Sequence, residues 1–417
     1  MGRPQDSIIV TNRTMMLVAT LLCLLITFVR WPEILLDAQF WGEDGWFWWP
    51  EARSLGLSSL WLPHTGYFQT DDRLVALLSA LLPLTWGPTL FAGAAFVFEV
   101  LPPAFLISQR CAALCPSLPL RCFLALMWCA LPNTWEVHGN LTNSQWHLAL
   151  LSFLIVLSSP PRTRGAWTFD TLLLALSAVS GPFSILLVPI AALRTWQLPS
   201  RASMVRLALL AAGATLQAAS IYLTQRGMPP LLGATPTNFV RLMAGQIMMG
   251  SLAGCLQLPY WYALGSWKIA LLPWLLFLVG AWLCIDALRR WPVLRYAGLF
   301  TALMLLASLS HPVATPGTPV WIAMRAPNMS MRYLFIPLVF WVSVVVIQAL
   351  GARWSWAKGT ALVFLALMVG FGIPQDWRFE PEPNRNFYEL AHQFDKAPPG
   401  TQITLPVRPG SQVTLTR

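Results

Sequence analysis

Long apolar segments separated by short polar ones run along almost the whole chain. A helix needs about 20 apolar residues to cross a bilayer, so the pattern predicts a first span over Met15–Trp31 and ten more after it. The later ones are Pro88–Ser108, Arg121–Trp135, Gln145–Ser158, Phe169–Ser180, Phe183–Leu193, Met204–Gln225, Trp267–Leu288, Leu294–Ser310, Tyr333–Leu350 and Thr360–Pro374. The predicted fold class is an all-α polytopic membrane protein with about 11 transmembrane helices.

Two segments depart from this pattern before the end of the chain. The loop Pro32–Arg73 is long and polar, and loops of this length are usually functional. Trp46–Leu57 and Leu74–Trp86 are candidates for short helices lying in the membrane interface. Thr237–Leu264 is helical in pattern but broken by glycines and a proline, so we interpret it as a re-entrant or interfacial helix on the outer face.

The last segment, residues 375–417, is polar, and it follows a transmembrane domain over residues 1–374. Asn386 and Glu389 have the spacing of a capping box at the start of a helix. Residues 401–407 and 412–416 alternate like strands around Pro409-Gly410, which predicts a hairpin. The tail is therefore expected to be a small helix-plus-hairpin appendage rather than a catalytic domain.

Composition indicates that most of the chain lies in a lipid bilayer, and the distribution of charge predicts which loops face the cytoplasm. The chain is 56% hydrophobic and 11% charged, and its formal net charge is +10. The basic residues are mostly arginines spread at the ends of apolar segments, which is a topology signal and not a nucleic-acid patch. Arginines are concentrated in alternate loops, and assigning these loops to the cytoplasm predicts a cytoplasmic N-terminus and a C-terminus outside. The expected partners are membrane lipids and no nucleic acid.

The motifs of common cofactor sites are missing from the sequence. The seven cysteines show neither a CxxC pair nor the cysteine–histidine spacing of a zinc site. There is also no P-loop or glycine-rich nucleotide motif. We therefore predict no cofactor and no metal ligand, and a divalent metal has no support in the sequence.

Carboxylates and cations gather in the loops assigned to the outer face. Glu43 and Asp44 stand in Trp41-Gly42-Glu43-Asp44-Gly45, directly after the first span. Further candidates are Asp71, Asp72 and Arg73, then His138, Arg325 and the pair Arg332-Tyr333, with Trp46 in the first loop. A carboxylate that deprotonates an acceptor needs a cation for the charge on the departing group, and these residues could supply both.

Each candidate also has a plainer structural interpretation. Glu43 and Asp44 could be solvated loop residues, and Asp71-Asp72-Arg73 could stabilise the start of the following helix. His138 could be held by the backbone, which is the commoner fate of a lone histidine. Arg332 could anchor a span in the interface, and the tryptophans, Trp46 among them, could form a membrane belt.

In these features the chain resembles the GT-C class of integral-membrane glycosyltransferases. The resemblance lies in the many spans, in the acidic pair directly after the first one, and in the interfacial helices of the loop that follows. Ser180-Gly181-Pro182-Phe183 and Met331-Arg332-Tyr333-Leu334 also look like segments of bacterial members of this class. The resemblance implies an inner-membrane enzyme that takes a sugar from a polyprenyl-phosphate donor, and the small tail favours a lipid or glycan acceptor.

The mechanism implied by this resemblance is an inverting displacement. Asp44, or Glu43 as second choice, would deprotonate the acceptor hydroxyl, and Arg332, Arg325 or His138 would hold the phosphate of the donor. Asp71, Asp72, Arg73, Tyr333 and Trp46 are further candidates for substrate contacts. Two other functions stay open: a transporter or flippase of lipid-linked sugars, and a non-catalytic scaffold with a GT-C-like fold.

Overall fold

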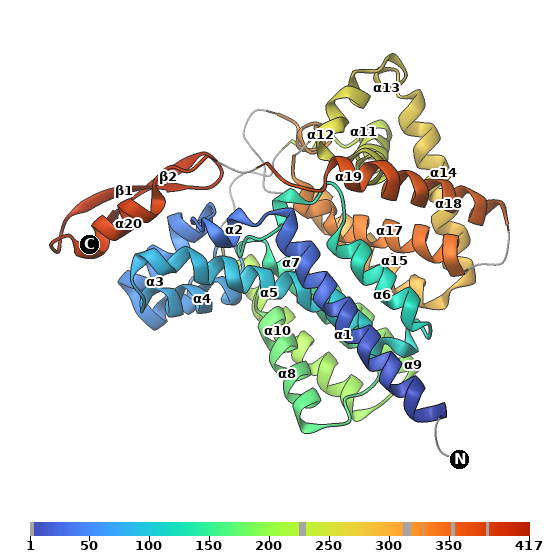
Figure 1. The fold of residues 1–417 in the computed structure, drawn as a ribbon, viewed down its shortest axis with the longest axis horizontal. Helices are drawn as coiled ribbons and strands as arrows, with labels where there is room; N and C mark the ends of the chain where they lie inside the picture. The colour runs from blue at the N-terminus through green and yellow to red at the C-terminus, as the bar shows by residue number, and fades with distance from the viewer. Residues whose placement is uncertain (1–3, 225–230, 312–317, 328, 352–354, 381–382) are drawn as a thin grey trace. The chain divides into compact units, whose positions relative to one another are not determined.

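The structure, a computed structural model, describes residues 4–224, 231–311, 318–327, 329–351, 355–380 and 383–417 (Figure 1). In this part of the chain every element except one hairpin is helical, as predicted for an all-α membrane protein. The α-helices are α1 (Pro4–Arg30), α2 (Glu33–Leu36), α3 (Trp49–Leu55), α4 (Thr70–Ala80), α5 (Gly87–Ile107), α6 (Leu118–Cys129), α7 (Ser144–Leu157), α8 (Arg164–Ala178), α9 (Phe183–Gln197), α10 (Arg201–Leu223), α11 (Pro236–Leu242), α12 (Gly250–Ala263), α13 (Gly265–Lys268), α14 (Leu271–Arg290), α15 (Pro292–Ser310), α16 (Val320–Met324), α17 (Phe335–Gly351), α18 (Trp356–Leu367), α19 (Ile373–Gln375) and α20 (Phe387–Lys396).

Short helices of other types and two strands complete the described chain. The π-helices are η1 (Asp44–Trp48), η6 (Met243–Met249) and η8 (Met368–Gly372). The 3₁₀ helices are η2 (Gly56–Trp61), η3 (Leu84–Trp86), η4 (Gln109–Ala113), η5 (Trp135–Val137) and η7 (Met331–Leu334). The strands β1 (Gln402–Val407) and β2 (Ser411–Thr416) form one antiparallel hairpin.

Eight helical stretches of the described residues are long and apolar enough to cross a membrane. They are Asn12–Arg30, Leu84–Ile107, Arg201–Leu223, Pro236–Ala263, Leu271–Arg290, Pro292–Ser310, Met331–Gly351 and Trp356–Gln375. Seven of these fall on predicted spans. The other four predicted spans form α6, α7, α8 and α9, which have 12 to 15 residues. At a rise of 1.5 Å per residue such helices are shorter than the hydrocarbon core of about 30 Å.

The one stretch that matches no predicted span, Pro236–Ala263, is not a straight helix. Gly254 has a φ of +72°, so the chain turns inside α12. Tyr262 consequently packs against Gly245, although a straight helix would hold residues 17 apart about 25 Å from one another. Trp267 stacks on Tyr262 and packs with Ala244 in one apolar cluster. The segment therefore folds back on itself at Gly254.

The described chain divides into two compact units. Unit 1 comprises Met1–Thr27, Pro103–Val137 and Gly227–Phe379, and unit 2 comprises Phe28–Pro102, His138–Arg226 and Glu380–Arg417. In unit 1, α17 is buried along most of its length and packs against α6, α14, α15 and α18. Its sequence is apolar on every face, as expected for a central helix. The indole N–H of Trp128 donates to Ser343 Oγ at 3.0 Å and fixes α6 against it.

In unit 2, the polar tail packs onto the first loop. Helix α20 buries Phe387, Ala391 and Phe394, which join Phe40 and Trp49 of the loop in one apolar core. The hairpin β1–β2 lies beside α20 (Figure 1). Residues 387–416 therefore pack with the first loop and do not form a separate body.

The start of α20 differs from the predicted capping box. Asn386 is the residue before the helix, but it adopts a left-handed conformation with φ of 60°, and its side chain makes no capping hydrogen bond. The backbone N–H of Asn386 instead donates to Asn384 Oδ1 in the preceding turn, at 2.7 Å. The capping-box prediction is therefore wrong, because the turn before the helix uses a different hydrogen bond.

Candidate functional site

Asp44 begins the π-helix η1 directly after a tight turn of the first loop. Gly42 has a φ of +33°, a conformation that residues with a Cβ rarely adopt. A Cβ placed on Gly45 would lie 2.9 Å from Val407 Cγ2 and 3.1 Å from Phe40 Cβ. The two glycines that flank the acidic pair in the sequence are thus required by the turn and by the close approach of the tail.

The Asp44 side chain is buried, with 3% of its surface exposed, whereas Glu43 is half-buried. Thr142 Oγ1 donates to Asp44 Oδ1 at 3.1 Å, and the Trp41 backbone N–H donates to Oδ2 at 3.3 Å. Burial raises the pKa of the Asp44 carboxyl well above its usual value; the charge of Glu43 adds to this, and the two hydrogen bonds oppose it. Asp44 is thus a carboxyl group that accepts a proton more readily than an exposed one.

Asp71 and Asp72 lie in the first turn of α4 and are also buried. Ser144 Oγ donates to Asp71 Oδ2 at 2.6 Å, and the Asp71 N–H donates to Ser180 Oγ at 3.0 Å. Burial raises the pKa of Asp71, and the hydrogen bonds from the serines oppose that shift. The first turn of a helix favours carboxylates, so the plainer interpretation of this pair explains its position. It does not explain the burial of both side chains.

Asp72 has the fewest hydrogen bonds of the three buried aspartates Asp44, Asp71 and Asp72. Its side chain is fully buried, and neither carboxyl oxygen has a hydrogen-bond partner within the described residues. Burial, followed by the charges of Asp71 and Asp44, raises the pKa of Asp72 well above its usual value. We call Asp44, Asp71 and Asp72 the acidic cluster. The charges of Asp71 and Asp44 thus oppose ionisation of Asp72.

The remaining predicted residues of the first loop face other partners. Arg73 Nη1 donates to Glu51 Oε2 at 2.7 Å, and its guanidinium lies 4.8 Å from the centre of the Trp48 ring. Trp46 is more than one-third exposed, as expected for a residue of a membrane belt. Arg73 is consequently occupied by Glu51 and Trp48, and it does not neutralise the acidic cluster through a salt bridge.

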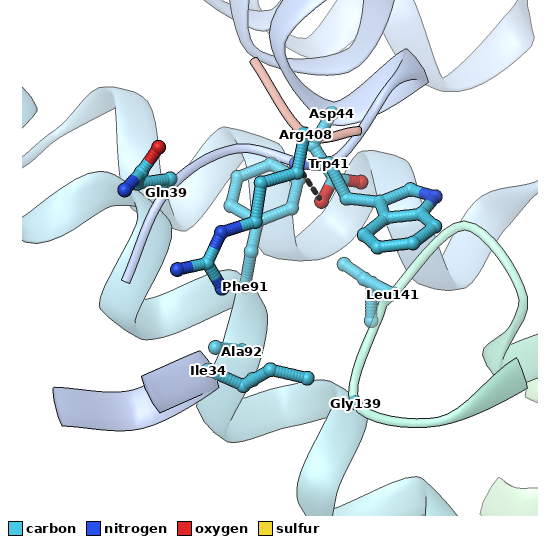
Figure 2. Close-up of a pocket in the computed structure, with 9 residues that line it drawn as sticks. All are labelled: Ile34, Gln39, Trp41, Asp44, Phe91, Ala92, Gly139, Leu141 and Arg408. Carbon is cyan, nitrogen blue, oxygen red and sulfur yellow. Dashed lines mark hydrogen bonds between the residues drawn. The ribbon is translucent and has the colours of Figure 1, made fainter. Parts of the chain in front are cut away.

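A small pocket opens beside Asp44 (Figure 2). It is lined by Ile34, Gln39, Trp41, Asp44, Phe91, Ala92, Gly139, Leu141 and Arg408. Figure 2 shows the Asp44 carboxylate beside the Trp41 backbone, with the Arg408 side chain extending along the pocket. The free volume is about 10 Å³, which is the room of one water molecule.

Arg408 is a pocket residue that the sequence did not single out. Its backbone N–H donates to Phe40 O at 2.8 Å, and its carbonyl accepts from the Gly42 N–H at 2.6 Å. The guanidinium is buried and donates to Asp37 O at 2.9 Å. Arg408 stands in a polar tail far from the loop in sequence. In the sequence Arg408 is recognisable only as an arginine next to the predicted hairpin turn Pro409-Gly410, which does not indicate a pocket residue.

His138 belongs to unit 2 and contacts a carboxylate of α5. Its Nδ1 lies 2.6 Å from Glu99 Oε1, and the Gly139 N–H donates to Glu99 Oε2 at 3.0 Å. Both side chains are largely buried. His138 Nδ1 thus contacts a side-chain carboxylate, and not the backbone group named in the plainer interpretation.

Arg332, Tyr333 and Arg325 belong to unit 1. Arg332 forms a salt bridge with Glu136, its backbone N–H donates to the same carboxylate at 2.9 Å, and its guanidinium lies over the Tyr333 ring. Arg325 has a neutral partner instead, because its Nη1 donates to Asn238 Oδ1 at 2.6 Å. Arg325 is therefore the predicted cation whose contacts include no carboxylate of the described chain.

The described residues contain no group of three or more histidine, cysteine, aspartate or glutamate side chains arranged to hold a metal ion. A scan against protein-family models, a search of curated proteins and a search of solved structures each gave no match.

Proposed function

We propose that the protein is a membrane glycosyltransferase that moves a sugar from a polyprenyl-phosphate donor to a lipid or glycan acceptor, with Asp44 as general base. The observation that carries the proposal is the state of Asp44. It is a buried carboxyl at the edge of a pocket, in a loop that directly follows the first long apolar helix. Burial raises its pKa, which brings a carboxyl closer to the range in which a general base works best.

In the proposed reaction the acceptor hydroxyl gives its proton to the Asp44 carboxylate. The hydroxyl oxygen then bonds to the anomeric carbon of the sugar, and the bond from that carbon to the phosphate oxygen breaks. The polyprenyl phosphate leaves with the electron pair, so its charge needs a cation. Of the cations predicted for that role, His138 belongs to the same compact unit as Asp44.

Thr142 and the acidic cluster suit this role for Asp44. The Thr142 hydroxyl donates to Oδ1 and accepts from the Trp48 indole at 3.2 Å, so the carboxylate is held in one orientation. The charges of Asp44 and Asp71 raise the pKa of Asp72, so Asp72 keeps its proton to higher pH than an exposed carboxyl does. The pocket holds only one water-sized group, so an acceptor hydroxyl could enter alone, and the lining must part to admit the sugar.

The test is transfer from a purified polyprenyl-phosphate sugar donor by the full chain in detergent. Asp44→Asn should lower the rate by about 10²–10⁴-fold, the usual effect of losing a general base. Glu389→Gln is the matched control, since Glu389 is an exposed carboxylate of α20 in the same unit, and it should leave the rate unchanged. Full activity in the double variant Glu43→Gln/Asp44→Asn would eliminate the catalytic proposal and leave the transporter and scaffold alternatives.

A further inference from the structure

Two arginines meet in unit 1 beside the backbone of Lys268, where the folded-back segment returns to its start. Arg241 belongs to α11, Lys268 ends α13, and Arg325 follows α16. Arg241 Nη2 donates to the Lys268 carbonyl at 2.5 Å, which joins the two ends of the segment. Arg325 reaches the same place through Asn238, which lies three residues before Arg241 and so on the same side of α11.

These cations have no acidic partner. Among the residues that the structure describes, no carboxylate lies within 4 Å of Arg241, Lys268 or Arg325. Burial and then the positive charge of Arg241 lower the pKa of the Arg325 guanidinium, so the two guanidinium groups repel each other. Holding like charges together without a counter-charge costs free energy, and proteins usually do so where an anion binds.

Two buried polar atoms at the same place have no partner in the described part of the chain. One is Arg241 Nε, which is an N–H donor, and the other is the Tyr262 hydroxyl. Tyr262 is positioned firmly, because its ring stacks on Trp267 with the centroids 4.4 Å apart. Buried donors of this kind are normally satisfied, so they indicate a ligand that would complete them.

We propose that Arg241, Arg325 and the Tyr262 hydroxyl, with Lys268 at the edge, form a binding site for a phosphate group. A phosphate has several oxygen acceptors and up to two negative charges, which suits two guanidinium forks and a hydroxyl better than a single carboxylate does. The residues that flank Tyr262 and Lys268 in the chain include the exposed apolar side chains Tyr260, Trp261, Leu264 and Ile269. This is the composition of a membrane interface, where lipid phosphates lie.

The site rests on the proposed function only for the identity of its natural ligand, because its chemistry requires a phosphate and not a sugar transfer. The ligand could be the headgroup of a membrane lipid or free phosphate. Calorimetric titration of the full chain in a neutral detergent distinguishes these, with short-chain phosphatidic acid in one arm and inorganic phosphate in the other. Binding of the lipid alone identifies a headgroup site, and equal response to inorganic phosphate identifies a site for the free ion.

In either arm Arg241→Gln/Arg325→Gln should weaken binding by at least about tenfold, the effect of losing one charge-assisted hydrogen bond. Tyr262→Phe keeps the ring stack and should weaken binding several-fold, which gives a second test if the double variant folds poorly. Arg295→Gln is the matched control, since Arg295 also donates to helix-end carbonyls of unit 1. Asp44→Asn should bind like the parent, which separates this site from the transfer reaction. Parent-like binding by folded double variant and Tyr262→Phe, or no binding of either probe by the parent, would overturn the proposal.

Discussion

Replacing Asp72 by asparagine tests whether the acidic cluster holds a proton. The substitution keeps the shape of the side chain and removes its ability to ionise. Asp72 is fully buried and its carboxyl oxygens accept no hydrogen bond from the described residues, so its charged form has no compensation there. The neutral side chain of asparagine should consequently be tolerated better than the carboxylate at any pH where Asp72 would ionise.

The sign of the pH dependence follows from the raised pKa of Asp72. In the unfolded chain the carboxyl ionises near its ordinary value of about 3.9. In the folded chain it stays protonated to higher pH, so the stability that comes with the neutral form is complete below the unfolded pKa. That stability is lost as pH rises toward the folded pKa. Over this window the parent should lose about 1.4 kcal/mol per pH unit relative to Asp72→Asn.

The assay is thermal unfolding of both proteins in the same detergent at several values between pH 4 and pH 8. The unfolding midpoint of Asp72→Asn should equal that of the parent near pH 4 and exceed it increasingly as pH rises. Glu389→Gln, which neutralises an exposed carboxylate of the same unit, should show no such trend. A difference that stays constant with pH, or that favours the parent at high pH, would refute the claim that Asp72 is buried without compensation.

Two further predictions concern the tail and the loop. Gly45→Ala should lower the unfolding free energy by about 1–3 kcal/mol, because its Cβ would lie 2.9 Å from Val407 in a packed core; an unchanged unfolding midpoint would contradict this. Asp395→Ala should cost about 1–2 kcal/mol, because its carboxylate accepts from the N–H groups of Leu84 and Thr85 before α5. The same thermal unfolding measurement checks it, and parent-like stability would show that water replaces the carboxylate.

Much of the helical architecture could be predicted from the sequence, because hydrophobic periodicity is a local property. The first long apolar helix, the short helices of the first loop, and the helix and hairpin of the tail all lie close to their predicted ranges. Number and length were harder to predict. Helices α6 to α9 end after 12 to 15 residues, at prolines, glycines and polar turns whose effect a hydropathy pattern averages out.

For the candidate site, the sequence predicted some of the residues but not their burial or their contacts. The sequence singled out Glu43 and Asp44 because they directly follow the first long apolar segment in a chain with few charged residues. It could not predict that Asp44 would be buried against Thr142, since burial depends on segments about a hundred residues apart.

Only the tertiary structure brought Arg408 from the tail to the pocket of the first loop, and only it brought Arg241 and Arg325 together. Each of these contacts joins residues that are neighbours in space and distant in the chain. The sequence by itself determined which segments are helical, because that choice depends on residues three and four apart. The packing of those helices decided which charged side chains contact one another. A local sequence pattern cannot predict such contacts, because the residues are distant in the chain.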